Sequence, residues 1–230
     1  FQRCIKQRNT LLRRDKLHPD ELSAWTRDLA QAGERLTACR RRYFEQLVPV
    51  FHEVAAELLP ECEAVTLRFR QGWDANLPYG EALAATANTD RDQGYTHVGP
   101  QRAEIAVTVG GYSAADTLSR GQQKIVVCAL KLAQGHVLRR QERSMTCSYL
   151  IDDLPSELDA AHTRRVCHQL EALGAQVFIT CIAADAMAGM WPADAVPPQL
   201  FHVEQGQVTP VSPANPGAPT PSNTNSENDA

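Results

Sequence analysis

The sequence lacks any apolar run near the roughly 18 residues that a membrane-spanning helix needs. It also lacks an excess of basic residues, because 23 Lys and Arg are outnumbered by 27 Asp and Glu, for a net charge of −4. This balance excludes a globally basic nucleic-acid-binding protein, so any contact with DNA must use a local patch. We expect no signal peptide at the start of the chain. We therefore predict a soluble protein, and because the first residue is Phe1 rather than Met, we expect its true start to be missing.

Paired cysteines are lacking as well. The seven cysteines are scattered singly and none forms a C-x-x-C motif, which excludes the ligand spacing of a zinc knuckle. An odd number of isolated cysteines is equally unlike a disulfide framework. We expect free thiols in a reducing cytoplasm. The residues are Cys4, Cys39, Cys62, Cys128, Cys147, Cys167 and Cys181.

Apolar residues are plentiful, at 43% of the chain, which is enough to bury a core. The length corresponds to about one to one and a half domains of ordinary size. Charge divides the chain in two, because the first sixty residues carry a net charge of +3 and the rest carry −7. This asymmetry predicts two regions with different partners.

The pattern of residues 1–62 predicts a helical arm. Apolar residues recur at steps of three and four, which places them on one face of a long helix. Asp20 is the predicted N-cap of this helix, and an earlier helix is expected over residues 1–16. Pro49 is expected to kink the long helix, and Pro60 ends its pattern. Because the apolar stripe lasts only about four heptads, we predict a short antiparallel arm rather than a coiled coil.

Residues 63–208 show a different pattern, in which strands alternate with helices. Several strands are apolar on both faces, which predicts a mainly parallel α/β sheet. Residues 209–230 contain five prolines and little apolar material, so we predict a disordered tail. The expected strands span 65–70, 95–98, 105–109, 148–151 and 177–179, with a hairpin over 200–208, and the expected helices span 79–88, 121–140 and 160–173.

Two acids, Asp152 and Asp153, follow the apolar strand at 148–151. Ligands of open α/β folds bind at the carboxyl ends of strands, where these carboxylates would lie. In a nucleotide hydrolase the first acid helps to hold Mg²⁺ and the second polarises the attacking water. Read alone, the pair can also be two solvated acids at a strand end.

A second motif, residues 117–124, lies directly before the helix expected at 121–140. Ser119 is well placed to cap that helix, which by itself explains the residue. The same geometry also makes an anion site, because free N–H groups, a hydroxyl and the small Gly121 suit a phosphate. Arg120 and Lys124 add positive charge.

A third motif, Ser156-Glu157-Leu158-Asp159, leads from the strand into the helix expected at 160–173, which Asp159 could cap. The three motifs together are more specific than each alone. An L-S-x-G-Q motif opens a helix and is followed about thirty residues later by four apolar residues, two acids and S-x-L-D. This order resembles the carboxy-terminal half of an ABC-type ATPase head.

The exact residues of these motifs narrow the resemblance to one family. The sequence has L-S-R-G-Q-Q-K, C-A-L-K-L-A-Q-G and Y-L-I-D-D-L-P-S-E-L-D, with Y-T-H-V-G-P-Q-R-A-E-I upstream. Residues 1–208 are thereby similar to the RecF family of bacterial DNA replication and repair ATPases. The expected fold is α/β, a partial P-loop (ABC-type) ATPase head with a helical arm domain.

The resemblance implies roles for the first motif. Ser119 and Gly121 match the signature that contacts the γ-phosphate of ATP held by the other subunit. Arg120, Gln122 and Lys124 belong to the same signature.

For the acids, the resemblance implies that Asp152 is the Mg²⁺ ligand and that Asp153 polarises the attacking water. Residues 156–159 match the D-loop, which crosses the dimer interface.

The resemblance also implies a cycle for the intact protein. ATP would join two heads into a homodimer, and its hydrolysis would release them. The family uses such a clamp-like switch on DNA at single-strand gaps, where with RecO and RecR it helps to load recombinase during DNA repair and the SOS response.

Three departures from the family pattern stand out. No G-x-x-x-x-G-K-[ST] motif occurs in the 230 residues, so the phosphate-binding P-loop is absent and we expect no ATPase activity from this chain alone. Cys181 stands where many ABC ATPases have a switch histidine, which leaves Thr180 as the nearest candidate for a γ-phosphate contact. Gln101 and Glu104 replace the His and Asp of a G-P-H-R-x-D pattern, for which strand-plus-turn structure is the default interpretation.

Rival interpretations remain open. The chain could be a non-catalytic module that binds DNA or a repair partner through its basic arm, where Arg40, Arg41 and Arg42 could contact phosphates or form a solvated helix face. It could also be the head of a chromosome-structure ATPase, although such heads carry far longer coiled-coil arms. Ser113 lies in a motif near the G-x-S-x-G nucleophile elbow, but the last Gly is missing and an ordinary turn explains it.

Overall fold

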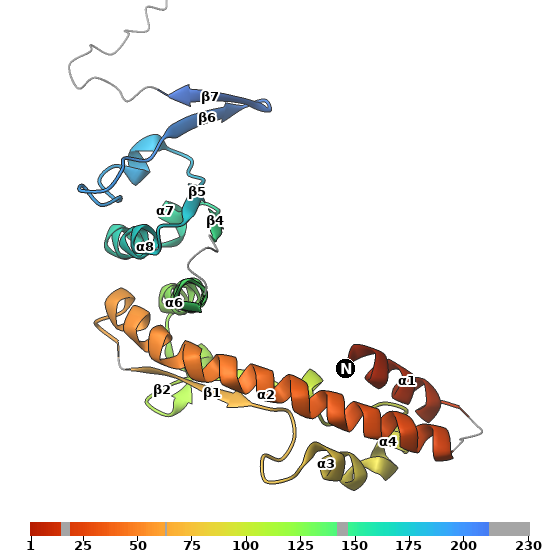
Figure 1. Ribbon diagram of the computed structural model, residues 1–230. Helices are drawn as coiled ribbons and strands as arrows, with labels where there is room; N and C mark the ends of the chain where they lie inside the picture. Colours follow the sequence, from red (N-terminus) through yellow and green to blue (C-terminus); the bar gives the residue numbers. More distant parts are fainter. Residues whose placement is uncertain (15–18, 63, 142–146, 212–230) are drawn as a thin grey trace, which may run out of the picture.

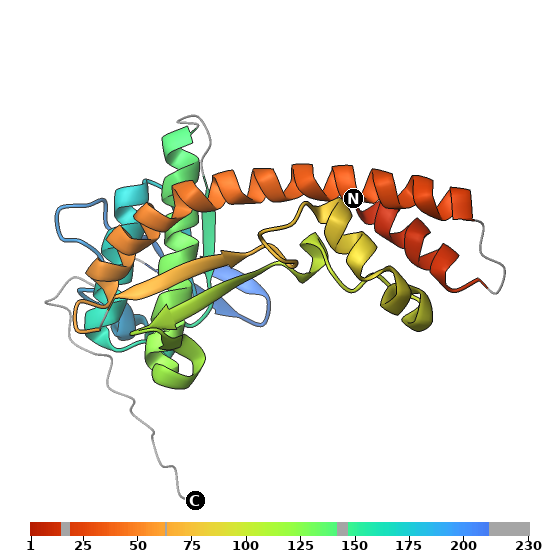
Figure 2. The same ribbon diagram turned by 90° about the horizontal axis from the view of Figure 1, so that it is seen from below.

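The computed structural model describes residues 1–14, 19–62, 64–141 and 147–211. In this part of the chain an elongated helical arm joins an α/β body (Figures 1 and 2). No helix within these ranges is long and apolar enough to cross a membrane. Most of the predicted tail lies outside them, and its first three residues, 209–211, belong to a strand instead.

Two helices build the arm. Helix α1 (Gln2–Leu12) packs beside the first part of α2 (Pro19–Leu58), which confirms the predicted long helix (Figure 2). The predicted cap is wrong, because α2 already begins at Pro19 and Asp20 lies in its first turn. There Asp20 and Glu21 face the positive end of the helix dipole, which stabilises them. Pro49 lies inside α2 without ending it, and the helix bends toward its carboxyl end (Figure 2).

An antiparallel sheet runs along α2 (Figure 1). Its strands, in spatial order, are β1 (Val65–Arg70), β2 (Glu104–Val109) and β3 (Tyr112–Ser113). Alternate β1 residues face the helix, as predicted, and the ring of Phe69 lies 5.8 Å from that of Phe44. The turn at 110–111 has two glycines with positive φ, the geometry that a two-residue hairpin needs.

Between β1 and β2 the chain returns to the arm. It forms α3 (Tyr79–Ala85), α4 (Ala87–Gln93) and the short 3-10 helix η1 (Pro100–Arg102). The strand predicted at 95–98 is absent, because this segment is held by side chains rather than by a neighbouring strand. Its Thr96 N–H donates to Asn9 Oδ1 at 3.0 Å, and the His97 N–H donates to Asp90 Oδ1 at 3.0 Å.

The α/β body follows. Helices α5 (Ala114–Thr117) and α6 (Arg120–Gln141) lead to β4 (Ser148–Ile151), and then α7 (Leu154–Glu157) and α8 (Ala160–Leu173) lead to β5 (Gln176–Ile179). Strands β4 and β5 pair in parallel through the α8 crossover. This is the sole parallel pair among the described strands, so the prediction of a mainly parallel sheet is wrong for this part of the chain. Gly174 ends α8 in the left-handed conformation, as predicted.

A final hairpin completes the described residues. After the 3-10 helix η2 (Ala184–Met187), strands β6 (Leu200–Glu204) and β7 (Gln207–Val211) pair antiparallel around Gln205 and Gly206. Both turn residues have positive φ, as the two-residue turn requires. The predicted hairpin is confirmed, and its side chains are exposed on both strands.

Among the described residues, buried side chains form two clusters, and α2 contributes to both. The larger cluster joins the last part of α2, including Phe51 and Leu58, to α6 and α8. The smaller cluster joins Leu29 of α2 to Tyr79 and Leu83 of α3. In both clusters, residues before position 62 therefore pack against residues after it. The division into a helical arm and an ATPase head at that position stays a prediction.

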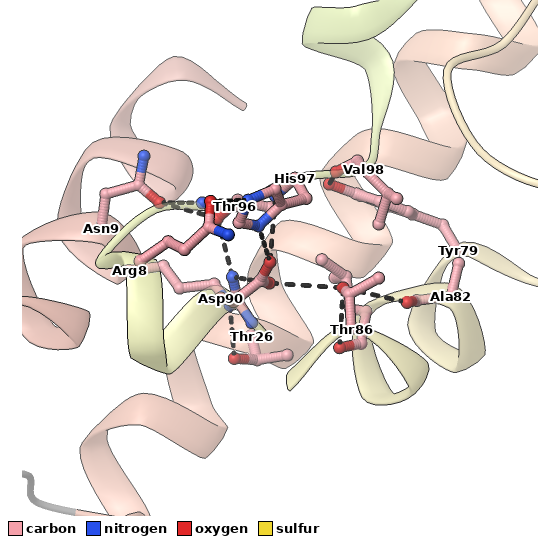
Figure 3. A network of polar contacts seen from close by, with 12 residues as sticks. Arg8, Asn9, Thr26, Tyr79, Ala82, Thr86, Asp90, Thr96, His97 and Val98 are labelled. Carbon is pink, nitrogen blue, oxygen red and sulfur yellow. Dashed lines mark hydrogen bonds and ion pairs between the residues drawn. The ribbon is translucent and has the colours of Figure 1, made fainter. Parts of the chain in front are cut away.

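A buried polar network holds the arm together (Figure 3). Arg8 of α1 pairs with Asp90 of α4 at 2.7 Å, and both side chains are at least 98% buried. Arg8 also donates to Thr26 of α2 at 3.1 Å and to Thr96 at 2.7 Å. Removing one member would leave a buried charge without its partner, so the network fixes how these elements sit together.

Candidate functional site

The acid pair lies at the carboxyl end of β4, where two hydroxyl groups hold it. Thr180, which follows β5, donates to Asp152 Oδ1 at 2.6 Å and accepts from the Asp153 N–H at 2.9 Å. Ser156 donates to Asp153 Oδ1 at 2.8 Å. Asp153 adopts the left-handed conformation, with φ of 48°, an arrangement that is rare outside glycine and clusters at functional sites.

Thr180 therefore reaches both acids from the neighbouring strand. Its own N–H donates to the Ile151 carbonyl at 2.9 Å and so continues the β4–β5 ladder. The role predicted for Thr180, a contact with γ-phosphate, stays a prediction. Its observed contacts make it a support for Asp152 and Asp153.

The signature motif forms a reciprocal cap at the start of α6. The Ser119 N–H donates to Gln122 Oε1 at 3.0 Å, and the Gln122 N–H donates to Ser119 Oγ at 3.3 Å. This is a capping box, so the structural interpretation of Ser119 holds. Gln122 also donates to the Cys62 sulfur at 3.1 Å and thereby ties the motif to the chain beyond α2. An anion role for the same helix start stays a prediction.

Gly121 faces open space. A Cβ added at this position would meet only the Ser119 hydroxyl, at 4.0 Å. Packing within the described chain therefore does not require glycine here, which leaves room for a group that approaches from outside. Arg120 is exposed beside it and makes no hydrogen bond or ion pair with another described side chain.

Residues 156–159, the predicted D-loop, connect the helix of the predicted signature with the acid pair. Glu157 forms an ion pair with Lys124 of α6, while the neighbouring Ser156 binds Asp153. Leu158 is buried in the larger core. The three predicted motifs are thus linked through residues 156–158, although no hydrogen bond among the described residues joins Ser119 directly to either acid.

Asp159 caps α8, as predicted, and belongs to a charged cluster. Its Oδ1 accepts from the His162 N–H at 2.9 Å, and the His162 ring lies 2.7 Å from Asp159 Oδ2 and 3.0 Å from Glu61 Oε1. Burial lowers the pKa of His162, but the hydrogen bonds and charges of the two acids outweigh it and raise that pKa. Hydrogen bonds lower the pKa of Asp159, above all the bond from the His162 backbone. Hydrogen bonds also lower the pKa of Glu61, first the bond from its own backbone.

The acid pair fits Mg²⁺ only together with a nucleotide. Within the described ranges no group of three or more His, Cys, Asp or Glu could hold a metal. Mg²⁺ is ordinarily held by one or two carboxylates plus substrate phosphates, not by a cage of protein ligands. Asp152 suits that role, because its Oδ1 is fixed by Thr180 and no described residue hydrogen-bonds its Oδ2.

The three arginines predicted to contact DNA differ in their surroundings. Arg40 donates to the Pro100 carbonyl at 2.6 Å, and Arg41 donates to Gln71 Oε1 at 2.7 Å. Arg42 lies 3.8 Å from the Cys39 sulfur, a weak contact. Arg40 and Arg41 thus pin the segments that flank β1 and β2 to α2, and their role on DNA stays a prediction.

The Gly99-Pro100-Gln101-Arg102 motif forms a turn, without the expected strand before it. The Gly99 N–H donates to the Gly72 carbonyl at 3.0 Å, and the Tyr79 hydroxyl donates to the Val98 carbonyl at 3.1 Å. A Cβ at Gly99, where φ is 132°, would collide with that hydroxyl. The motif is therefore a packed turn beneath α2.

One face of the β4–β5 sheet is open, which the sequence did not indicate. Leu150 is 81% exposed and Phe178 is 53% exposed, although both lie in apolar strands. An apolar cavity of about 630 Å³ lies between α6 and β4, and Leu150 is part of its lining. Two strands alone make a marginal sheet, so this face and its edges suit coverage by further protein.

Comparison with known proteins gives a consistent result. The family model described as RecF/RecN/SMC N terminal domain matches residues 5–208. The chain is 48% identical over 209 residues to the DNA replication and repair protein RecF of Azotobacter vinelandii, and 46% identical to that of Pseudomonas aeruginosa. Each match covers 91% of this chain and 56% of the relative, so the chain spans about half the length of these relatives.

Solved structures agree on the fold. The recombination mediator protein RecF with ATPrS, from the RecFOR pathway, matches with a TM-score of 0.73 at 22% identity, over 92% of this chain and 57% of that one. The corresponding RecF–ATP structure matches with the same TM-score at 23% identity.

Proposed function

Because the chain belongs to the RecF/RecN/SMC N-terminal domain family, we propose that it forms the signature and acid-pair half of the ATPase head of a DNA replication and repair protein. The observation that carries this proposal is the cluster at the end of β4, where Thr180 and Ser156 orient Asp152 and Asp153. Such support from outside the acids is what a catalytic centre requires and what two solvated acids do not need.

The residues of this half have separable roles. When bound, ATP with Mg²⁺ supplies the phosphoryl group that is transferred to water. Asp152 would hold the metal, and its carboxylate is oriented for this by Thr180. Asp153 orients the attacking water and accepts its proton, and its left-handed backbone is fixed by Thr180. Ser119 and Gly121 present the start of α6 to the nucleotide of a second subunit, with Arg120, Gln122 and Lys124 around them.

The phosphate-binding loop must come from elsewhere in the intact protein. The open β4–β5 face supports this division, because a lobe carrying that loop would cover Leu150 and Phe178. We propose that ATP joins two such heads and that hydrolysis releases them. The switch acts in the cytoplasm on DNA at single-strand gaps, where RecO and RecR are the proposed partners in recombinase loading.

The alternative of a non-catalytic module that binds through Arg40, Arg41 and Arg42 has less support. Two of these side chains already hold the fold through hydrogen bonds. A non-catalytic function also does not explain the hydrogen-bonded arrangement around Asp153.

The dimer role of the signature can be tested separately from its cap. The test protein is A. vinelandii RecF with its matching segment replaced by this chain. Ser119→Asp keeps a good helix cap but places a negative charge where phosphate would approach. We expect normal ATP binding and loss of ATP-driven dimers. The control, Ser113→Asp, adds the same charge at an exposed position outside the motif and should dimerise normally. Dimers that survive Ser119→Asp would contradict the proposal.

A further inference from the structure

A basic groove of about 820 Å³ lies where β1 meets α2 and the turn before β2. Its charged residues are four arginines and two glutamates, which gives a local net charge of +2 on a protein whose overall charge is −4. They are Arg41, Arg68, Arg70, Arg102, Glu45 and Glu104. This is a local basic patch of the kind that an acidic protein needs to contact a polyanion.

Three of the arginines are available for a ligand. Arg68, Arg70 and Arg102 are exposed, and none makes a hydrogen bond or ion pair with another described side chain. Arg41 differs, because it is bound to Gln71. Guanidinium groups without protein partners suit phosphate oxygens, which they bind with two parallel hydrogen bonds.

Aromatic rings lie between these charges. Phe44, Phe69 and Trp73 line the groove and are only partly buried. The Trp73 ring is fixed, since its centroid lies 4.7 Å from that of Tyr79 and its Nε1–H donates to the Leu77 carbonyl at 3.1 Å. Fixed rings among arginines are the combination that stacks unpaired bases while the charges follow the backbone.

The edge of the sheet shapes the groove. β1 is an edge strand that pairs only with β2 among the described strands, and residues from both of its faces line the groove. Arg68 and Arg70 lie on the exposed face of β1, whereas Leu67 packs against the larger core and Phe69 contacts Phe44 of α2. A ligand that passes around this edge meets charge on one side and rings on the other.

We propose that this groove binds single-stranded DNA, with phosphates on Arg68, Arg70 and Arg102 and a base against Trp73. The inference rests on the proposed role on DNA. It makes Arg68, Arg70 and Arg102 the principal contacts with DNA in place of Arg40 and Arg42. Single strands fit better than duplex, because the bases of a duplex are stacked inside the helix and cannot reach the rings.

The first test measures binding of a dT oligonucleotide of about 12 nucleotides by this chain without nucleotide, using fluorescence anisotropy. The triple variant Arg68→Gln, Arg70→Gln, Arg102→Gln should weaken binding by about 10-fold or more. It should also lower the slope of log K against log salt by about 2, at roughly 0.7 for each lost phosphate contact. The control triple, Arg3→Gln, Arg27→Gln, Arg91→Gln, removes equal charge from exposed positions on α1, α2 and α4 and should bind nearly as well as the parent.

The second test measures the fluorescence emission of Trp73 and leaves this side chain unchanged. In a Trp25→Phe, Trp191→Phe background, dT should quench Trp73 emission, and a duplex of the same length should bind more weakly and quench less. Equal losses in the two arginine triples would overturn the groove assignment while leaving a DNA role in place. Tighter duplex binding without quenching would overturn the single-strand assignment. No binding to either DNA would overturn both the groove and the proposed DNA role.

Discussion

Two hydroxyl groups hold the acid pair in its unusual geometry. Thr180 and Ser156 reach Asp152 and Asp153 from separate segments, so both acids are fixed before any ligand arrives. The sequence predicted the acids from their place after an apolar strand. It could not predict their supports, because Thr180 lies 28 residues from Asp152 and meets it only through the β4–β5 pairing.

Two glycines, Gly121 and Gly99, provide a prediction at the scale of single residues. Gly121→Ala should leave the free energy of unfolding unchanged or slightly raised, because its Cβ meets open space and alanine favours helix. Gly99→Ala should lower that free energy by about 2 kcal/mol or more, because φ is positive and the Cβ collides with Tyr79. Urea unfolding of the two variants checks this. Equal losses would show that the start of α6 is packed in a way that this account lacks.

At the scale of elements, the cluster of His162, Asp159 and Glu61 joins the start of α8 to the turn that follows α2. The raised pKa of His162 means that its contribution to stability is complete below the ordinary value of 6.5 and is lost as pH rises through the raised value. The lowered pKa values of Asp159 and Glu61 mean that the contribution of these acids to stability is present above pH 3.8 and pH 4.5, respectively. This contribution is lost as pH falls through the lowered values. The cluster should therefore stabilise the fold most between pH 4.5 and pH 6.5.

This ordering gives a pH prediction. From about pH 6 to about pH 9 the free energy of unfolding should fall by about 0.2 to 1 kcal/mol more in the parent than in His162→Gln, because the side chains of the two acids are 46% and 65% exposed. Urea titrations of both proteins at the two pH values measure the difference. An equal fall in both would show that His162 does not link these elements.

Elements with local chemical signals were predictable, and elements fixed by distant partners were not. Alternation predicted β1, and Asp159 and Gly174 marked the two ends of α8. Residues 95–98 have the composition of a strand, yet Asn9 and Asp90 bind their backbone and no strand forms. The parallel sheet was overpredicted for a related reason, since apolar runs do not reveal whether both faces are covered.

At the scale of the whole molecule, the described residues form a helical arm, a small antiparallel sheet, an open parallel pair of strands and a final hairpin. The arm closes on itself through the buried Arg8–Asp90 pair, whereas the α/β body leaves Leu150 and Phe178 exposed. Self-contained packing at one end and open apolar strands at the other are what half of an ATPase head should show. The sequence predicted half of a head, from a signature and an acid pair without a P-loop, but it did not indicate the open face, which required the structure.

The most direct test of this account is ATP turnover by A. vinelandii RecF carrying this chain in place of its matching segment. We expect Mg²⁺-dependent hydrolysis that falls by about 100-fold or more in Asp153→Asn, since this is the acid proposed to orient the water and accept its proton. Asp185→Asn, an exposed acid outside the cluster, should leave the rate unchanged. A folded hybrid that hydrolyses ATP equally well with and without the Asp153 carboxylate would contradict the assignment of this chain as the catalytic half of the head.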